Sequence, residues 1–296
     1  MKKIIIMLLL ISFIAQGCIE LPETSNRLTV VTTFYPLYEF SKRIGGEKAE
    51  VSILVPAGTE PHDWEPGAKD IIKIESARIF VYNGASLEPS IDNILKRIQS
   101  RELLVVDSSA GIELVKEGGR PDPHIWLDPI LAVRQVENIE AAFVKADPGN
   151  SDYYKANALE LKKELAALDM EISKELASAR KKVFITSHTA FGYFALRYGL
   201  QQIAISGLSP NAEPGPAKIA EIVEIAKKNN VKYIFFETLA SPKLSEVIAK
   251  EAGASTLVLN PIEGLSEIQI NQGVNYFTLM RENINNLKIA LEADNG

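Results

Sequence analysis

The fold is decided by the stretch VFITSHTAFGYFALRYGLQQIAISGLSPNAEPGPAKIAEIVEIAKKNNVKYIFFET, residues 183–238, because an earlier stretch has the same order of predicted elements. The earlier stretch is VVTTFYPLYEFSKRIGGEKAEVSILVPAGTEPHDWEPGAKDIIKIESARIFVYNG, residues 30–84. Each stretch predicts, in order, a β-branched strand, a helix ending near glycine, an apolar strand, a Glu-Pro loop, an amphipathic helix and a buried strand. The parallel continues, since ELLVVDSSAGI (102–112) matches STLVLNPIEGL (255–265) in place and type.

Strands that alternate with helices predict a parallel sheet with helices on both faces. The duplication therefore predicts an α/β fold of two similar parallel-sheet lobes, at residues 27–146 and 183–296. Between them, residues 147–182 contain no glycine or proline after position 150, and apolar residues recur every three or four positions. We expect one rigid helix of about 30 residues, roughly 45 Å long, that joins the lobes. The alternative is an ordinary long core helix.

The composition excludes some classes of protein. The chain has 296 residues, of which 46% are hydrophobic and 24% charged, as is typical of globular proteins. Its net charge of −6 opposes a nucleic-acid-binding surface, which needs a basic face. We expect no nucleic-acid partner.

The first 26 residues are predicted to lie outside the fold. Three residues with two lysines precede an apolar run at 4–15, which is too short to span a bilayer, since a spanning helix needs about 20 residues. Residues 1–18 are predicted to be a signal peptide that resembles a lipoprotein signal, with Cys18 carrying the lipid anchor. Residues 19–26 would form a tether. The alternative is a plain signal peptide with an incidental cysteine. Cys18 is the only cysteine, so no intrachain disulfide is expected.

All three histidines stand where predicted strands end. His62 follows VSILVP, His124 lies in PDPHIWLDP after LLVVD, and His188 closes VFITSH. Ligands of open parallel sheets bind outside the carboxyl ends of the strands, so these side chains could face one crevice. A single histidine is more often a surface or core residue. Three in proline-rich or strand-end positions favour a transition-metal site, and Trp64 or Trp126 could exclude water from it.

Three imidazoles leave one position of a tetrahedral site open. Glu263 in LNPIEGL follows another predicted strand and is the candidate for it, although a loop glutamate can simply be solvated. Glu60 and Asp63 beside His62 are alternatives. Glu237 in FFETLASP is flanked by apolar residues and is expected to be a buried structural acid.

The motifs GTEPHDWEP, PHIWLDP, SHTAFGYFA and NPIEGL, in this order, resemble the metal-binding solute-binding proteins of ABC importers, the zinc/manganese cluster. The resemblance covers essentially the whole mature chain. It implies two α/β lobes joined by a long helix, and ligands at His62, His124, His188 and Glu263. If Glu263 does not bind, a water or Glu60 is the fallback for the fourth position. It also implies a monomeric, non-enzymatic carrier outside the cytoplasm, periplasmic or lipid-anchored, that delivers its ion to an ABC permease and its ATPase. Some relatives are credited with surface adhesion.

Two features bear on which ion the site would hold. Manganese-type members tend to carry glutamate at the position of His188, and many zinc-type members have a histidine-rich loop that the stretch 108–122 lacks. Three nitrogens and one carboxylate suit Zn²⁺, whereas Mn²⁺ favours more oxygen ligands. Zinc is therefore expected. Manganese or broader divalent specificity is the alternative, and nickel and copper stay open.

Two other functions fit the sequence less well than metal transport does. A metallohydrolase could use three histidines, but the sequence has no HExxH, Gly-x-Ser-x-Gly or P-loop motif. Ser187 and His188 are adjacent on a strand and would point to opposite faces. An organic-ligand lipoprotein would need an arginine-lined cleft, and Arg120 is the nearest arginine. For the metal site, Asp128 or Asp63 is expected to accept hydrogen bonds from the imidazoles.

Overall fold

The computed structural model describes residues 27–293 apart from 99 and 211. The predicted signal peptide, Cys18 and the tether at 19–26 lie outside the described residues. None of the helices in the described part is long and apolar enough to cross a membrane.

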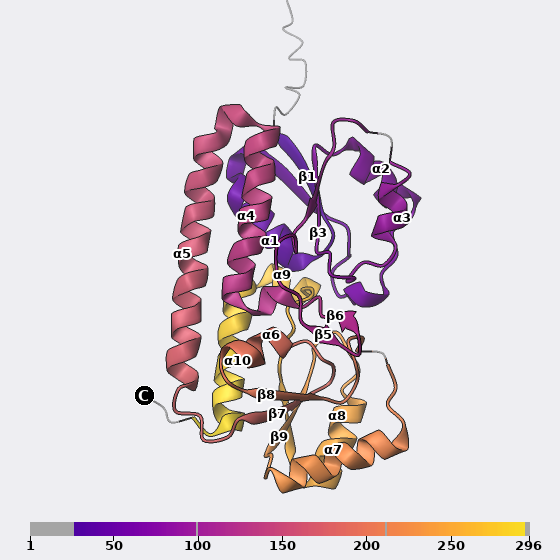
Figure 1. Cartoon of the computed structure of the whole chain (residues 1–296), viewed down its shortest axis with the longest axis vertical. Helices are drawn as coiled ribbons and strands as arrows, with labels where there is room; N and C mark the ends of the chain where they lie inside the picture. The colour runs from indigo at the N-terminus through magenta and orange to yellow at the C-terminus, as the bar shows by residue number, and fades with distance from the viewer. Residues whose placement is uncertain (1–26, 99, 211, 294–296) are drawn as a thin grey trace, which may run out of the picture.

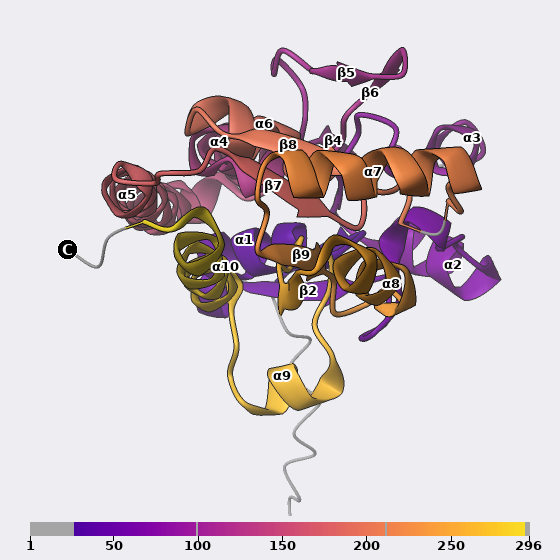
Figure 2. The ribbon, with the colours of Figure 1, turned by 90° about the horizontal axis from the view of Figure 1, so that it is seen from below.

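The N-terminal lobe contains a four-stranded parallel sheet with the order β2-β1-β3-β4. Its strands are β1 (Leu28–Thr32), β2 (Ala49–Ile53), β3 (Ile79–Tyr82) and β4 (Leu104–Asp107). Its helices are α1 (Tyr35–Gly45), α2 (Ala68–Ser76), α3 (Ile91–Leu95) and α4 (Pro129–Ala146), with short 3₁₀ turns at Gly46–Lys48, Pro61–Asp63 and Ile125–Leu127. A small hairpin of β5 (Lys116–Glu117) and β6 (Arg120–Pro121) projects from the body of the molecule (Figure 2).

The C-terminal lobe repeats this plan with the order β10-β9-β7-β8. Its strands are β7 (Val183–Thr186), β8 (Gln201–Ala204), β9 (Tyr233–Phe236) and β10 (Ser255–Val258). Its helices are α6 (Gly192–Arg197), α7 (Pro216–Lys228), α8 (Lys243–Ala252), α9 (Glu267–Asn271) and α10 (Tyr276–Leu291). In both lobes the order is second, first, third and fourth strand. The prediction of two similar parallel α/β lobes is confirmed.

Helix α5 (Ser151–Leu176) joins the lobes and runs beside both of them (Figure 1). Its 26 residues give a length of about 39 Å, slightly shorter than expected, because Pro148–Asn150 forms a separate 3₁₀ turn and the helix already ends at Leu176. The buried residues recur every three or four positions, as Tyr154, Ala158, Leu161, Leu165, Leu168, Ile172 and Leu176. Glutamates of α5 pair with Arg43 on α1 and with Arg281 on α10, so the helix is fastened to both lobes.

One apolar core runs through both lobes. It includes Phe34 and Trp126 from the first half and Phe184, Phe191 and Tyr276 from the second, and the inner face of α5 belongs to it. Because apolar packing is continuous, the lobes do not meet at a solvent-filled hinge. The boundaries at 27–146 and 183–296 stay a prediction about the chain's organisation.

Candidate metal centre

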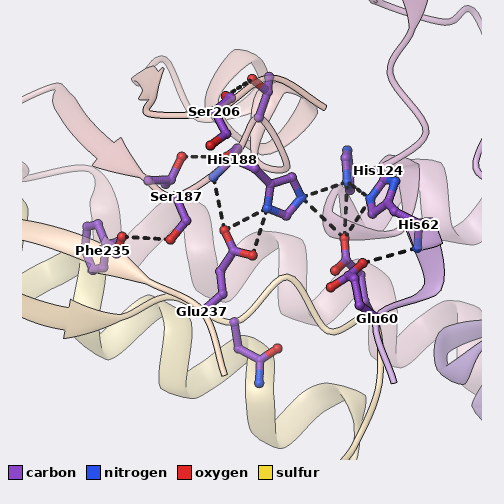
Figure 3. Close-up of polar contacts among 12 residues, drawn as sticks. Glu60, His62, His124, Ser187, His188, Ser206, Phe235 and Glu237 are labelled. Atoms are coloured by element: carbon purple, nitrogen blue, oxygen red, sulfur yellow. Dashed lines mark hydrogen bonds and ion pairs between the residues drawn. The ribbon is translucent and has the colours of Figure 1, made fainter. Parts of the chain in front are cut away.

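Four predicted site residues meet between the lobes. His62 lies in the turn after β2, His124 begins the 3₁₀ turn before α4, His188 follows β7, and Glu263 lies in the loop after β10. One ligand atom from each lies within 4.8 Å of all the others. Figure 3 shows the three imidazoles turned toward one another. Each comes from a different segment, so only the tertiary fold brings them together.

Five of the six distances among these atoms fit a tetrahedron. The Nε2 atom of His124 lies 3.1 Å from that of His62 and 3.2 Å from that of His188. Glu263 Oε1 lies 3.3, 3.2 and 3.5 Å from the Nε2 atoms of His62, His124 and His188. Four ligands on zinc bonds of 2.0 to 2.1 Å are separated by about 3.3 Å in a regular tetrahedron. Five edges of the arrangement therefore have the length expected of a tetrahedral zinc site, and the sixth, between His62 and His188, is within 4.8 Å.

The site is nearly closed to solvent. The side chains of His124, His188 and Glu263 are fully buried, and that of His62 is 9% exposed. Among the described residues, neither Glu263 oxygen has a conventional hydrogen-bond donor, and Oε1 lies against the three imidazoles. A buried anion is costly unless a positive charge compensates it. A bound cation would supply that charge.

Carboxylates orient two of the imidazoles. Asp122 Oδ1 lies 2.7 Å from His124 Nδ1. Glu237 oxygens lie 2.7 and 2.8 Å from His188 Nδ1 (Figure 3). An Nδ1–H that donates to a carboxylate leaves the Nε2 lone pair directed into the site. Glu237 is the buried acid that the sequence predicts, and it also acts on His188.

The expectation that Asp128 orients an imidazole is wrong. Asp128 caps α4, because its carboxylate accepts a hydrogen bond of 2.8 Å from the amide of Ile130. It also pairs with Arg197 of α6 across the lobes. The histidine partners are instead Asp122 and Glu237, so Asp63 does not take the expected role at either of those two imidazoles.

The ionisation of the imidazoles follows these contacts. Burial would lower the pKa of His188, but Glu237 and Glu263 outweigh it and raise that pKa well above the usual value. Burial likewise opposes protonation of His124, yet the hydrogen bond to Asp122 raises its pKa. A metal ion would therefore have to displace protons from these nitrogens, as metal binding to histidine requires.

The pKa values of Glu263, His62 and Glu60 shift in different directions. Burial would raise the pKa of Glu263, but its contacts with the three imidazoles hold it well below the usual value, so the carboxylate is ionised. Burial lowers the pKa of His62. Burial, followed by the charge of Glu263, raises the pKa of Glu60 to about 9. Glu60 accepts a bond of 3.2 Å from the His62 amide and lies outside the four-atom cluster.

The aromatic and serine neighbours have structural contacts. Trp126 is fully buried, its ring lies 5.2 Å from that of His124, and its indole N–H donates to the Pro261 carbonyl at 2.7 Å. Trp126 therefore covers one side of the His124 ring, while Trp64 packs against the apolar clusters. Ser187 donates to the Phe235 carbonyl at 3.3 Å, which is no nucleophile–base arrangement (Figure 3).

Comparison with known proteins identifies relatives along nearly the whole chain. The sequence is 43% identical over 282 residues to "High-affinity zinc uptake system protein ZnuA" of Bacillus subtilis (strain 168), covering 90% of this chain and 88% of that protein. It is 38% identical over 304 residues to "Zinc-binding lipoprotein AdcA" of Streptococcus pneumoniae serotype 4, covering 97% of this chain but only 61% of AdcA.

Solved structures agree with these relatives. The Zn(II)-bound ZnuA-like domain of Streptococcus pneumoniae AdcA superposes with a TM-score of 0.81 at 41% identity, over 90% of this chain and 99% of that one. The laminin-binding protein Lmb of Streptococcus agalactiae, described as an adhesin with metal transporting activity, gives 0.81 at 34% identity over 89% and 99%. The family model "Zinc-uptake complex component A periplasmic" matches residues 30–290, so this chain belongs to that family of zinc-uptake solute-binding proteins, which are transport components and not enzymes.

Proposed function

We propose that this protein captures Zn²⁺ outside the cytoplasm and delivers it to an ABC permease and its ATPase. His62, His124, His188 and Glu263 are the proposed ligands. The observation that carries the proposal is the position of one Glu263 oxygen, which lies 3.2 to 3.5 Å from three imidazole nitrogens. Family membership over residues 30–290 supports the transport role.

The donor set favours zinc over manganese. Zinc accepts four ligands of mixed nitrogen and oxygen type in a closed tetrahedron, whereas Mn²⁺ prefers more oxygen donors and a larger coordination number. The bound ion would leave a charge of about +1 after Glu263 is counted, and the carboxylates of Asp122 and Glu237 stabilise it through the imidazoles. A broader divalent specificity is the second candidate.

The ion would enter beside His62, the one ligand with measurable exposure. A small cavity of about 130 Å³ borders His62 and is lined by residues of both lobes, among them Leu87, Pro123 and Leu208. The other three ligands are fully buried, and contacts across the lobes surround them. We therefore expect capture to need small local movements and not a wide opening of the lobes.

Calorimetric titration of the metal-stripped protein tests the proposal. We expect one tight Zn²⁺ site, much weaker Mn²⁺ binding, and a clear loss of zinc affinity in Glu263→Ala. Glu60→Gln is the matched control, because it changes the neighbouring buried carboxyl and should leave zinc affinity within about twofold of the unchanged protein. Comparable affinities for the two metals would support broader specificity. Failure to bind zinc would overturn the proposal.

The cellular placement is proposed on the N-terminal sequence and the family. Residues 1–18 are the proposed signal peptide, Cys18 is the proposed lipid anchor, and residues 19–26 are the proposed tether. The carrier is proposed to be a monomer. AdcA, with which this chain shares 38% identity, is named a lipoprotein. Cys18→Ser should move the protein from the membrane fraction to the soluble fraction without changing zinc affinity. Unchanged fractionation would exclude the lipid anchor. Light scattering of the soluble form measures its mass and so tests whether the carrier is a monomer.

A further inference from the structure

The residue before Glu263 has an unusual backbone conformation. Ile262 has a φ of +61° and is fully buried. This left-handed region favours glycine, and a β-branched side chain is rarely found there because it clashes with its own backbone. Such a conformation persists only where the surrounding structure enforces it. Ile262 therefore marks a place where the fold holds the chain against its local preference.

Two asparagines hold this segment in place. The amide of Ile262 donates to Asn260 Oδ1 at 2.8 Å. The amide of Asn260 donates to Asn283 Oδ1 at 2.7 Å, and Asn283 Nδ2 donates back to the Asn260 carbonyl at 2.7 Å. Asn283 lies on α10 and is buried, as is Asn260. We call Asn260 and Asn283 the asparagine clamp.

The clamp lies next to the only carboxylate in the four-atom cluster. Glu263 has no conventional hydrogen-bond donor of its own among the described residues. Apart from its contacts with the three imidazoles, its position therefore depends on the backbone that carries it. The Pro261 carbonyl, on the other side of Ile262, accepts the bond from Trp126. The loop is thus fixed at Asn260 and at Pro261, and the left-handed turn at Ile262 directs Glu263 toward the imidazoles.

We propose that the asparagine clamp holds Ile262 in its left-handed conformation and so presents Glu263 to the three histidines before the metal arrives. Asn260 and Asn283 are then positioning residues for the fourth ligand. This inference rests on the proposed zinc-binding function. It adds that zinc affinity depends on residues that do not touch the ion.

The expected size of the effect follows from the backbone. A strained conformation of this class is populated about 5- to 140-fold less than the favoured ones when nothing enforces it. If only the left-handed state presents Glu263 correctly, the apparent zinc affinity falls by the same factor when the clamp is lost. Glycine at position 262 has no such preference. Loss of the asparagine clamp should then lower the apparent zinc affinity only about twofold.

A double-mutant cycle tests this dependence. Zinc dissociation constants of Asn283→Leu, Ile262→Gly and the double variant are measured by competition with a chromophoric chelator. We expect Asn283→Leu to weaken zinc binding about 5- to 140-fold in the presence of Ile262 but only about twofold when residue 262 is glycine. The cavity that Ile262→Gly creates is present both in the single variant Ile262→Gly and in the double variant, so its effect on zinc affinity cancels when these two are compared.

Measuring Asn283→Leu in a variant without Glu263 distinguishes a role in positioning Glu263 from a general loss of stability. In Glu263→Ala no carboxylate remains to be positioned, so adding Asn283→Leu should cause no further loss of zinc affinity. Equal losses in all three backgrounds would overturn the proposal, because they would indicate general destabilisation. If Asn283→Leu does not fold, Trp126→Phe removes the bond to Pro261 and should show the same dependence on residue 262. Failure of the unchanged protein to bind zinc would instead refute the proposed function.

Discussion

Replacing Glu237 with glutamine tests how the buried carboxylate acts on His188. Glu237 is buried, and its two oxygens lie 2.7 and 2.8 Å from the imidazole Nδ1. Glutamine keeps one oxygen as an acceptor, so the tautomer of His188 should be retained while the negative charge is lost. The change converts a charge-assisted hydrogen bond into a neutral one, a difference of about 1 to 1.4 kcal/mol. Zinc affinity should fall roughly five- to tenfold.

The pH dependence of this deficit gives a sharper test. Opposing the effect of burial, Glu237 raises the pKa of His188 in the metal-free protein, so protons compete with zinc for that imidazole. Glu237→Gln lowers the His188 pKa and weakens that competition. The deficit should therefore be largest at alkaline pH, where the unchanged protein has lost the proton, and should shrink on acidification.

The assay is competition with a chromophoric chelator between pH 6 and 9. Glu88→Gln is the matched control, because Glu88 is also a buried carboxyl but accepts from Thr33 and from the amides of Asn83 and Gly84 and touches no histidine. It should leave zinc affinity unchanged. Unaltered affinity in Glu237→Gln, or a deficit that grows as the pH falls, would refute the assigned role of the carboxylate.

Three further predictions follow from the charges and contacts. Arg197→Met removes the pair with Asp128 that links the lobes and should lower the unfolding free energy by about 1 kcal/mol in urea denaturation, whereas no change would show that the pair is not stabilising. In the metal-free protein the pKa of His188 is raised, so protonated His188 stabilises the folded state. This stabilisation is fully present below about pH 6.5 and is lost as the pH rises through the raised pKa. Denaturation should therefore show less stability at pH 9 than at pH 7 for metal-free protein, and an increase would contradict the assignment. Because α5 is fastened to both lobes, small-angle scattering should show little change in the radius of gyration on zinc binding, and a large compaction would contradict the rigid connection.

The fold was predictable because the chain contains the same pattern of strands and helices twice. Strands and helices recur in the same order in residues 30–84 and 183–238, and the two sheets share one strand order. The limits of α5 were less predictable. Asp147 and Pro148 begin a separate 3₁₀ turn, and the helix ends at Leu176 although strong helix formers continue beyond it. Where a helix ends depends on the contacts that the chain makes next, and composition does not encode these contacts.

The histidines were predictable from their places after predicted strands, because carboxyl ends of parallel strands gather at one edge of each sheet. The structure brings all three together with Glu263. That these four residues bind the ion stays a prediction for the titrations above. The family and its zinc-uptake role, by contrast, are confirmed by the matched relatives.

The acids around the histidines show what sequence patterns can and cannot reveal. The Asp-Pro pair at 128–129 is a usual start of a helix, an aspartate cap followed by proline in the first turn, and this signal should have excluded Asp128 as a histidine partner. Asp122 stands two residues before His124, within reach of both its amide and its ring, so a local argument could have found it. Glu237 lies 49 residues from His188 and reaches it only because β9 pairs with β7.

The same distinction applies to Ile262. Asn-Pro-Ile-Glu gives no sign of a left-handed isoleucine, because the conformation opposes what a β-branched residue prefers. Local sequence predicts the backbone where local preference and tertiary packing agree, and natural sequences mostly keep them in agreement. The disagreement at Ile262 lies next to the carboxylate that completes the four-atom cluster, and the asparagine clamp, whose two members lie 23 residues apart along the chain, enforces it. A conformation that local preference opposes is thus maintained there by contacts from distant parts of the chain, and these contacts fix where the neighbouring carboxylate lies.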